Sequence, residues 1–200
     1  MASRYRDKRT ERFANRQHVP AFSGFARQAA IKLRIVESAR ALSTMANLPG
    51  NRFEVLRGDR SGQYSIRIND QWRICFQWSD EASLAINIEI ADYHEEIAPM
   101  SMAFNPIHPG DVLAEQIEAL GITAAEAARA LGIPQSRVSQ ILHGRRAITA
   151  DTALRLSRWL GTDDEFWMNL QIRYDLDIAK DRKGDAIARI VSPVPTLVSS

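Results

Sequence analysis

Cysteine is almost absent from this chain, and its absence excludes several classes of protein. The 200 residues include one cysteine, Cys75, so neither an intramolecular disulfide framework nor a cysteine-based zinc cluster is available. A single free thiol is typical of a reducing cytosol. No hydrophobic run approaches the ~18 residues of a membrane-spanning helix, and the N-terminus lacks the apolar stretch of a secretory signal. We therefore expect a cytoplasmic protein that requires no metal, cofactor or membrane.

Basic residues are absent from residues 76–99, although the chain as a whole is nearly neutral. The chain has 26 Lys and Arg against 24 Asp and Glu, and 15 of the 26 fall within residues 1–75 beside only 6 acidic residues. Of those 15 basic residues, 13 are arginine, whose planar guanidinium contacts phosphate through two parallel hydrogen bonds. The first 75 residues therefore indicate a polyanion-binding surface, with a solvated basic face as the alternative.

Hydrophobic periodicity changes within the first hundred residues. Apolar residues from Phe22 to Val36 recur at helical spacing and predict one amphipathic helix over about 20–43. The opposite face of that helix is partly basic: Arg27, Lys32, Arg34 and Arg40. Apolar residues then alternate with polar ones, which predicts three antiparallel strands over 64–68, 72–78 and 84–90. The helix should cover the apolar face of this sheet in an α+β fold, leaving a polar face with Arg67, Arg73, Cys75, Gln77, Asn87 and Glu89.

The second half of the chain lacks any alternating pattern and predicts an all-α domain of five short helices. Thr123 with Glu126, and Thr162 with Glu165, have the spacing of a capping box and should each begin a helix. The fifth helix should end near Leu176. Prolines between the two parts indicate a boundary. We expect an N-terminal domain over 1–95, a linker over 96–106, a helical domain over 107–179 and a mobile tail over 180–200.

The strongest motif lies in residues 123–142, TAAEAARALGIPQSRVSQIL. Gly132 permits the left-handed turn between two short helices, and Val138 and Ile141 point back to the core. The exposed positions of the second helix carry side chains that can read base edges or phosphates: Gln135, Ser136, Arg137, Ser139 and Gln140. The pattern therefore predicts a DNA-binding helix-turn-helix, with an ordinary helical hairpin as the alternative.

This helical part resembles the HigA antitoxins of the Xre/Cro-like helix-turn-helix family over roughly 102–179. The residues that carry the resemblance are the motif above together with IHPGDVL (107–113), GRRAITADTALRL (144–156) and FWMNLQ (166–171). The resemblance implies a symmetric dimer on a palindromic operator, with Gln135, Ser136, Arg137 and Gln140 facing the major groove. It also places three side chains near phosphate: His143, Arg145 and Arg146. The alternative role for the two arginines is simple solvation.

The first 95 residues are similar to the HigB toxins of the RelE-like superfamily. The matching segments are LRGDRSGQYSIRI (56–68), WRICF (72–76) and DYH (92–94). The resemblance implies cleavage of messenger RNA in the ribosomal decoding site, by attack of a ribose 2′-hydroxyl on the adjacent phosphate. Such a reaction requires a base, an acid and positive charge beside the phosphorane.

Candidate residues are present for each of these roles. Arg73 projects from the polar face as a phosphate clamp, and His94 is the group that titrates near neutrality. The full set of candidate catalytic residues is Glu54, Arg57, Arg73, Asp92, Tyr93 and His94, with Arg60 and Arg67 as RNA-binding residues.

Structural roles are the alternatives for several of these residues. Arg73 can pair with Glu89 across the sheet, Arg60 can stabilise a turn, His94 can be a surface residue, and Tyr93 can serve in packing. Some relatives have His where this chain has Glu54, and many have Lys where it has Arg57. An arginine stays protonated and cannot be a general base, so Glu54 is the remaining candidate at these two positions, with a solvated strand residue as the alternative. A module that binds RNA without cleaving it is then the alternative to an enzyme.

The order of the two parts predicts a type II toxin–antitoxin pair written as one chain. In this hypothesis a ribosome-dependent messenger-RNA endonuclease is inhibited by contact with its antitoxin domain, within or between chains. The antitoxin domain would also bind operator DNA as a homodimer and repress its own operon. Two alternatives remain: a transcriptional repressor whose N-terminal part binds RNA or a partner without catalysis, and a purely RNA-binding module.

Overall fold

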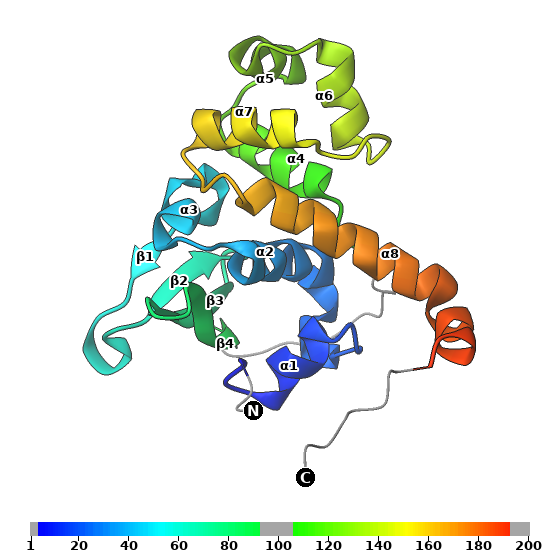
Figure 1. Cartoon of the computed structure of the whole chain (residues 1–200). Coiled ribbons are helices and arrows are strands. Elements are labelled where there is room, and N and C mark those ends of the chain that lie inside the picture. Colours follow the sequence, from blue (N-terminus) through cyan, green and yellow to red (C-terminus); the bar gives the residue numbers. More distant parts are fainter. Residues whose placement is uncertain (1–3, 93–105, 193–200) are drawn as a thin grey trace.

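The computed structural model describes residues 4–92, the N-terminal domain, and residues 106–192, the C-terminal domain (Figure 1). Residues 96–105 of the predicted linker lie outside the described residues. The N-terminal domain is α+β, as predicted. Its elements in order are α1 (Lys8–Ala14), η1 (Pro20–Phe25), α2 (Ala26–Ser38), α3 (Leu42–Asn47), η2 (Pro49–Asn51), β1 (Glu54–Val55), η3 (Gly58–Arg60), β2 (Tyr64–Arg67), β3 (Trp72–Ser79) and β4 (Leu84–Asp92).

The predicted single helix over 20–43 is wrong. The segment begins as the 3₁₀ turn η1, because Pro20 fixes the backbone at its first position. Helix α2 then ends at Ser38, because the next residue, Ala39, has an extended backbone (ψ 139°) that turns the chain, and α3 follows as a separate short helix. The apolar spacing correctly marks the buried side of these helices, but it does not predict the two changes of direction.

The four strands form one antiparallel sheet in the order β1-β2-β3-β4. The predicted three-stranded meander is therefore confirmed, with β1 as an added edge strand. Helix α2 contacts β3 and β4 on the apolar face, where Ile66, Ile74 and Phe76 are fully buried. Residues 4–6 lie beside the other edge, since Arg6 and Ile88 are joined by a backbone hydrogen bond of 2.9 Å.

A β-bulge in β4 interrupts the predicted alternation. Cys75 pairs with Glu89, but Gln77 pairs with Ile86, so two residues of β4 oppose Phe76. One of them, Asn87, adopts a left-handed backbone with φ 50°. The extra residue shifts the side-chain phase, so Ala85 is buried while Ile86 is partly exposed. The alternation predicted over 84–90 would place Ile86 on the apolar face, and this is wrong.

The C-terminal domain has the five predicted helices: α4 (Pro109–Ala119), α5 (Ala124–Leu131), α6 (Gln135–Leu142), α7 (Ala150–Leu160) and α8 (Phe166–Ile190). The predicted end of the last helix near Leu176 is wrong, because α8 continues to Ile190. The predicted start of a tail at residue 180 thus falls inside this helix. Residues 193–200 lie outside the described residues.

The two domains share one hydrophobic cluster. Buried side chains of α2, such as Leu33 and Val36, belong to the same cluster as Val112 of α4 and Trp167 of α8. Helix α8 lies across α2 in Figure 1, and the two helices are in contact. Within the described residues, no helix has the length and hydrophobicity needed to cross a membrane.

Candidate functional site

Arg73 is held in place on the polar face of the sheet. Its Nε donates to the Ser65 hydroxyl at 2.9 Å, and its Nη2 donates to the Arg52 carbonyl at 2.9 Å. The same Nη2 lies 3.1 Å from a carboxylate oxygen of Glu54. Because Glu54 pairs with Ser65 between β1 and β2, and Arg67 pairs with Arg73 between β2 and β3, strand register brings these groups together.

The exposure of the two charged groups differs. The Arg73 side chain is 11% exposed, whereas the Glu54 side chain is 55% exposed. A guanidinium fixed by two hydrogen bonds loses little entropy when it binds an anion. An exposed carboxylate beside it is accessible to a bound hydroxyl group. The pair can therefore supply a base and a cation at one place, which are two of the three requirements for ribose-directed RNA cleavage.

A second polar cluster surrounds Glu89 on β4. Its Oε1 accepts from Arg6 at 3.0 Å and from Arg60 at 2.9 Å, which explains why Arg60 is only partly exposed. Cys75, opposite Glu89 in the sheet, is fully buried, and burial raises the pKa of its thiol. The predicted exposed position of Cys75 is wrong, because side chains of the polar face cover it. A buried protonated thiol is a poor nucleophile.

The remaining predicted RNA-site residues lie around these clusters. Arg57 precedes η3 and is exposed. Arg67 pairs with Asp70 and donates to the Asn69 carbonyl at 3.0 Å. Asp92, at the end of β4, accepts from the Gln71 amide at 2.9 Å. Tyr93 and His94 lie outside the described residues.

The helix-turn-helix is built by local hydrogen bonds and one tight turn. Thr123 and Glu126 form the predicted capping box, with bonds of 3.2 and 2.8 Å. Hydrogen bonds from Thr123 lower the pKa of Glu126. Gly132 takes the left-handed conformation at φ 63° between α5 and α6. Arg155 of α7, which the sequence did not single out, donates to the Leu131 carbonyl at 3.0 Å and supports the turn.

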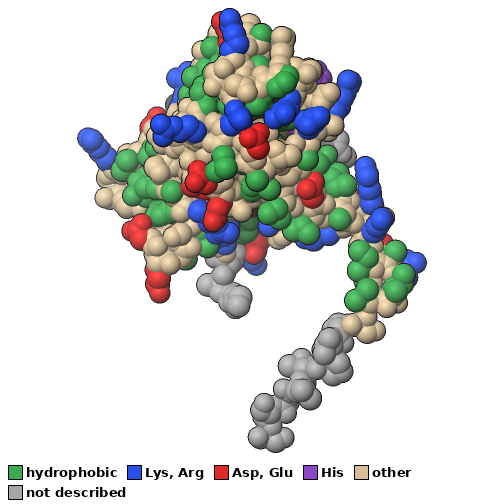
Figure 2. All heavy atoms as spheres, turned by 45° about the horizontal axis from the view of Figure 1, so that its top comes forward, with side chains coloured by type: hydrophobic (Ala, Val, Ile, Leu, Met, Phe, Trp, Pro, Cys, Tyr) green, Lys and Arg blue, Asp and Glu red, His purple; other side chains and the backbone are tan. Residues whose placement is uncertain are grey.

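Helix α6 presents its polar side chains to solvent. Val138 and Ile141 are fully buried. The predicted DNA-contacting side chains Gln135, Ser136, Gln140, His143, Arg145 and Arg146 are exposed, and Arg137 and Ser139 are partly exposed. Figure 2, which brings this end of the molecule forward, shows Lys and Arg side chains distributed over its surface.

Several of these side chains already have partners within the domain. Arg137 lies 3.4 Å from the carboxylate of Asp151, and Arg146 donates to the Gln140 side chain at 2.8 Å. His143 and the Ser139 carbonyl are 2.7 Å apart through Nδ1. These contacts are exposed, so they orient the side chains and leave them accessible to DNA.

Among the residues that the structure describes, four ion pairs join the domains, and in each of them the basic residue comes from the N-terminal domain. The pairs are Arg16–Asp181 (2.7 Å), Arg27–Asp111 (2.7 Å), Lys32–Glu115 (2.8 Å) and Arg34–Asp177 (2.9 Å). The basic face predicted for the helix over 20–43 was expected to be exposed, and this expectation is partly wrong. Lys32 is 1% exposed and Arg34 is 11% exposed, because α4 and α8 cover them. No pattern in the N-terminal sequence could have revealed that cover.

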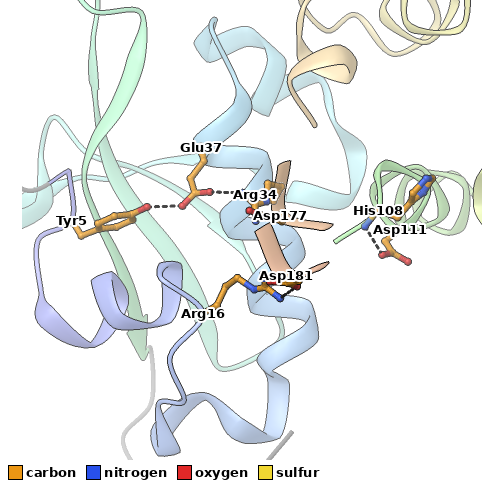
Figure 3. Close-up of polar contacts among 8 residues, drawn as sticks. All are labelled: Tyr5, Arg16, Arg34, Glu37, His108, Asp111, Asp177 and Asp181. Atoms are coloured by element: carbon orange, nitrogen blue, oxygen red, sulfur yellow. Dashed lines mark hydrogen bonds and ion pairs between the residues drawn. The ribbon is translucent and has the colours of Figure 1, made fainter. Parts of the chain in front are cut away.

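Figure 3 shows how the interface continues into the N-terminal segment. The Tyr5 hydroxyl donates to Glu37 at 2.6 Å, and the other oxygen of Glu37 accepts from Arg34 at 3.3 Å. Arg34 in turn donates to Asp177 of α8 at 2.9 Å. Burial and the neighbouring Glu37 raise the pKa of Tyr5. One chain of polar contacts therefore links the N-terminal segment that contains Tyr5 to α2 and α8.

The interface and the Arg73 cluster lie on different sides of the sheet. The C-terminal domain contacts α2 and η2 through α4 and α8, and Thr44 of α3 donates to Asp163 at 2.5 Å. All of these elements belong to the helical layer. Arg73 bonds to Ser65 and Glu54 on the other face of the sheet, away from the buried Ile74 and Phe76. Helix α6 lies at the far end of the C-terminal domain (Figure 1).

Comparison with known families gives a match for each domain. Residues 3–94 match the profile described as the RelE-like toxin of the type II toxin–antitoxin system HigB, and residues 113–167 match a helix-turn-helix profile. Toxin HigB-1 of Vibrio cholerae is 40% identical over 42% of this chain and 90% of its own length. Antitoxin HigA-1 of the same organism is 34% identical over 44% of this chain and 84% of its own length.

A solved structure described as an addiction module antidote protein of a HigA family from Coxiella burnetii is 48% identical to this chain. The match covers 46% of this chain and 100% of that protein, with a TM-score of 0.45.

Proposed function

Because this chain belongs to the HigB–HigA family of type II toxin–antitoxin proteins, with a HigB-like toxin domain before a HigA-like helix-turn-helix domain, we propose that its N-terminal domain is a ribosome-dependent messenger-RNA endonuclease. The N-terminal domain is called the toxin domain from here on, and the C-terminal domain the antitoxin domain. The observation that carries the proposal is the fixed Arg73–Glu54 pair on the open face of the sheet.

In the proposed reaction the two residues have different roles. Glu54 accepts the proton of the ribose 2′-hydroxyl as that oxygen attacks the adjacent phosphate. Arg73 donates hydrogen bonds to the phosphate oxygens, whose negative charge increases in the transition state. Arg67, opposite Arg73 in the sheet, adds positive charge for the neighbouring phosphate. The acid that protonates the leaving 5′-oxygen would come from the end of β4, where Asp92, Tyr93 and His94 follow one another in the sequence.

The antitoxin domain would inhibit this enzyme without covering the reacting groups. It binds the helical layer through α2, α3 and η2, on the side of the sheet opposite Arg73. Its bulk would keep the toxin domain out of the narrow decoding site, and inhibition in the cytoplasm would last as long as the domains stay together. This geometry favours steric exclusion over direct occlusion.

A growth assay combined with mapping of cleavage sites in messenger RNA tests the proposal. Residues 1–99 should arrest growth and cleave ribosome-bound messenger RNA when expressed alone, whereas the full chain should do neither or only weakly. The Arg73→Ala form of residues 1–99 should be inert at equal protein level. If residues 1–99 accumulate and leave growth and message intact, the enzyme is excluded and the non-catalytic alternatives, a repressor or an RNA-binding module, replace it.

A second function, repression of its own operon, is supported by the exposed polar surface of α6. One recognition helix makes few contacts, and a homodimer on a palindromic operator doubles them. We expect half-sites about one helical turn, or ~10 base pairs, apart. Footprinting the full chain on the DNA upstream of its own gene tests this function, and one protected half-site without its symmetry mate would contradict the dimer.

A further inference from the structure

A lysine ammonium is buried between the two domains. The side chain of Lys32, on α2, is 1% exposed. Its Nζ lies 2.8 Å from Glu115 of the antitoxin domain and donates to the Asn51 side chain at 3.2 Å and to the Gly50 carbonyl. The three N–H groups of the ammonium therefore have three acceptors, and the single charged one comes from the other domain.

Glu115 is less well satisfied than Lys32. One of its carboxylate oxygens contacts Lys32, while the other, Oε2, is buried without a hydrogen-bond partner among the described residues. Burial lowers the pKa of Lys32 and raises the pKa of Glu115, and each charge opposes that shift in the other. Lys32 alone would be an uncompensated buried charge, and so in large part would Glu115, whose side chain is 27% exposed but whose Oε2 is buried. Proteins tolerate such charges poorly.

The backbone next to Lys32 fits the same place on the antitoxin domain. The Gly50 amide donates to the Gln116 side chain at 3.0 Å. A Cβ at position 50 would lie 3.2 Å from Gln116 Oε1 and 3.3 Å from the Glu115 Cγ. Shape and charge are therefore matched at one point, where α4 meets η2.

Loss of the partner carboxylate would cost less at the other interdomain ion pairs. Arg27 remains 65% exposed beside Asp111, so water would solvate it without a partner, and exposed pairs contribute little. Arg34 is buried, but Glu37 of its own domain also pairs with it at 3.3 Å. Among the described residues that form these pairs, Lys32 is the buried base whose charge is balanced from the antitoxin domain alone.

We propose that Lys32 and Glu115 determine which antitoxin domain this toxin domain accepts. The proposal rests on the toxin–antitoxin pairing of the proposed function. A helix-turn-helix domain without an acidic residue at this point would bury the lysine unpaired, and a toxin domain without the lysine would bury Glu115 unpaired. A buried pair of this kind adds little net affinity compared with well-packed apolar side chains. Its contribution is the penalty against mismatched partners.

The test uses the full chain with a protease site inserted between residues 96 and 105. Cleavage of that site makes the association of the domains bimolecular, and a dilution series followed by size-exclusion chromatography gives its dissociation constant. Four forms are compared with the wild type: Lys32→Met, Glu115→Met, the double Met variant, and Arg27→Met as the matched control at an exposed pair.

Each single Met variant should raise the dissociation constant about 100-fold or more, the usual effect of leaving one buried charge unpaired. The double variant should return to within about tenfold of the wild type, and Arg27→Met should stay within about threefold of it. A double variant as weak as the single ones would overturn the proposal, because the pair would then supply affinity. Single variants equal to the wild type would overturn it as well.

Glu115→Gln provides a second route if a Met variant fails to fold. It keeps the shape and an acceptor for Lys32 but removes the charge, and the same loss of association is expected. The binding measurement needs no catalysis. Normal pairing together with no RNA cleavage by residues 1–99 alone would therefore refute the endonuclease and leave the pairing proposal standing. RNA cleavage by residues 1–99 together with single Met variants that pair like the wild type would refute the pairing proposal and leave the endonuclease standing.

Discussion

Arg16 and Asp181 form a two-bond ion pair although 165 residues separate them in the chain. Each terminal nitrogen of Arg16 donates to a different carboxylate oxygen of Asp181, and both bonds are 2.7 Å long. The pair holds the later turns of α8 beside the loop that follows α1 (Figure 3). Residues 185–190 of that helix are exposed, so this contact is formed where apolar burial is small.

Arg16→Ala should therefore loosen the end of α8 without affecting its buried start. Backbone amides of residues 182–190 should exchange with deuterium several-fold faster, while amides of residues 168–172 stay unchanged. Arg12→Ala, a neutralisation on the preceding helix α1, serves as the control. Because exposed charges are screened by salt, the difference should shrink at 1 M NaCl. A uniform change over the whole of α8 would show that the pair does not act locally.

Arg73→Ala should lower the rate of RNA cleavage by residues 1–99 by about 10²–10³-fold, the usual loss of one positioned donor. Arg73→Lys should recover little of it, since an ammonium cannot donate to Ser65 and the substrate phosphate in the same fixed geometry. Lys8→Ala, on an exposed face of α1, is the matched charge control. Full activity of Arg73→Ala with a native circular dichroism spectrum would remove Arg73 from the mechanism.

Two arginines of the antitoxin domain should affect DNA binding in different ways. Arg137→Ala should weaken binding to the operator by about 1–3 kcal/mol per half-site and leave random DNA nearly unaffected, if the side chain contacts a base. Gln135→Ala and Gln140→Ala should act similarly. Arg145→Ala should weaken both kinds of DNA alike and reduce the salt slope by about one. Salt-titrated isotherms on both duplexes measure the difference, and identical effects of the two arginine changes would contradict base reading by α6.

His108 should make the stability of the antitoxin domain sensitive to mild acid. Its Nδ1 accepts the Gly110 amide at 2.9 Å at the start of α4, and its ring packs edge-on against Tyr174. Burial lowers the pKa of His108, and the nearby carboxylates of Asp111 and Asp175 oppose that shift without cancelling it.

The sign of the pH effect follows from that shift. Above the unfolded pKa of about 6.5 the ring is neutral in both states, so its contribution is fully present. As the pH falls below that value the unfolded chain binds the proton first and stability is lost, by no more than about 1.4 kcal/mol per pH unit. His108→Asn keeps a capping side chain and should flatten the curve of unfolding free energy between pH 7 and pH 5. Parallel curves for the two proteins would contradict the role of His108.

Local patterns predicted the helix-turn-helix better than the other parts of the fold. Thr123 and Glu126 cap α5 as their spacing predicts, because all the partners lie within four residues. The same spacing at Thr162 and Glu165 misleads. Thr162 is bonded to Ser157, Asp163 accepts from Thr44 of the toxin domain, and α8 begins without a side-chain cap. The Thr162 hydroxyl donates to Ser157 at the end of α7, so the cap that the motif required at the start of α8 is not formed.

The candidate RNA site was predicted in part. Alternation of apolar residues placed Arg73 on the polar face, and this is where it lies. The sequence did not predict that the Arg52 carbonyl would hold it, because Arg52 lies outside every predicted strand, in the segment between η2 and the short edge strand β1. Nor could it predict that Lys32, one polar residue on an amphipathic helix, would become fully buried, since the cover comes from another domain.

The covalent connection between toxin and antitoxin domains changes what their interface must achieve. Two partners joined by a short segment meet at an effective concentration on the order of 1 mM, whatever the amount of protein in the cell. An interface with a dissociation constant of about 1 µM would then leave roughly one chain in a thousand open. In the proposed function, each chain supplies one antitoxin domain for every toxin domain, so inhibition needs no excess of a separate antitoxin. Release of the toxin domain therefore depends on cutting the chain, and falling protein levels alone would not achieve it.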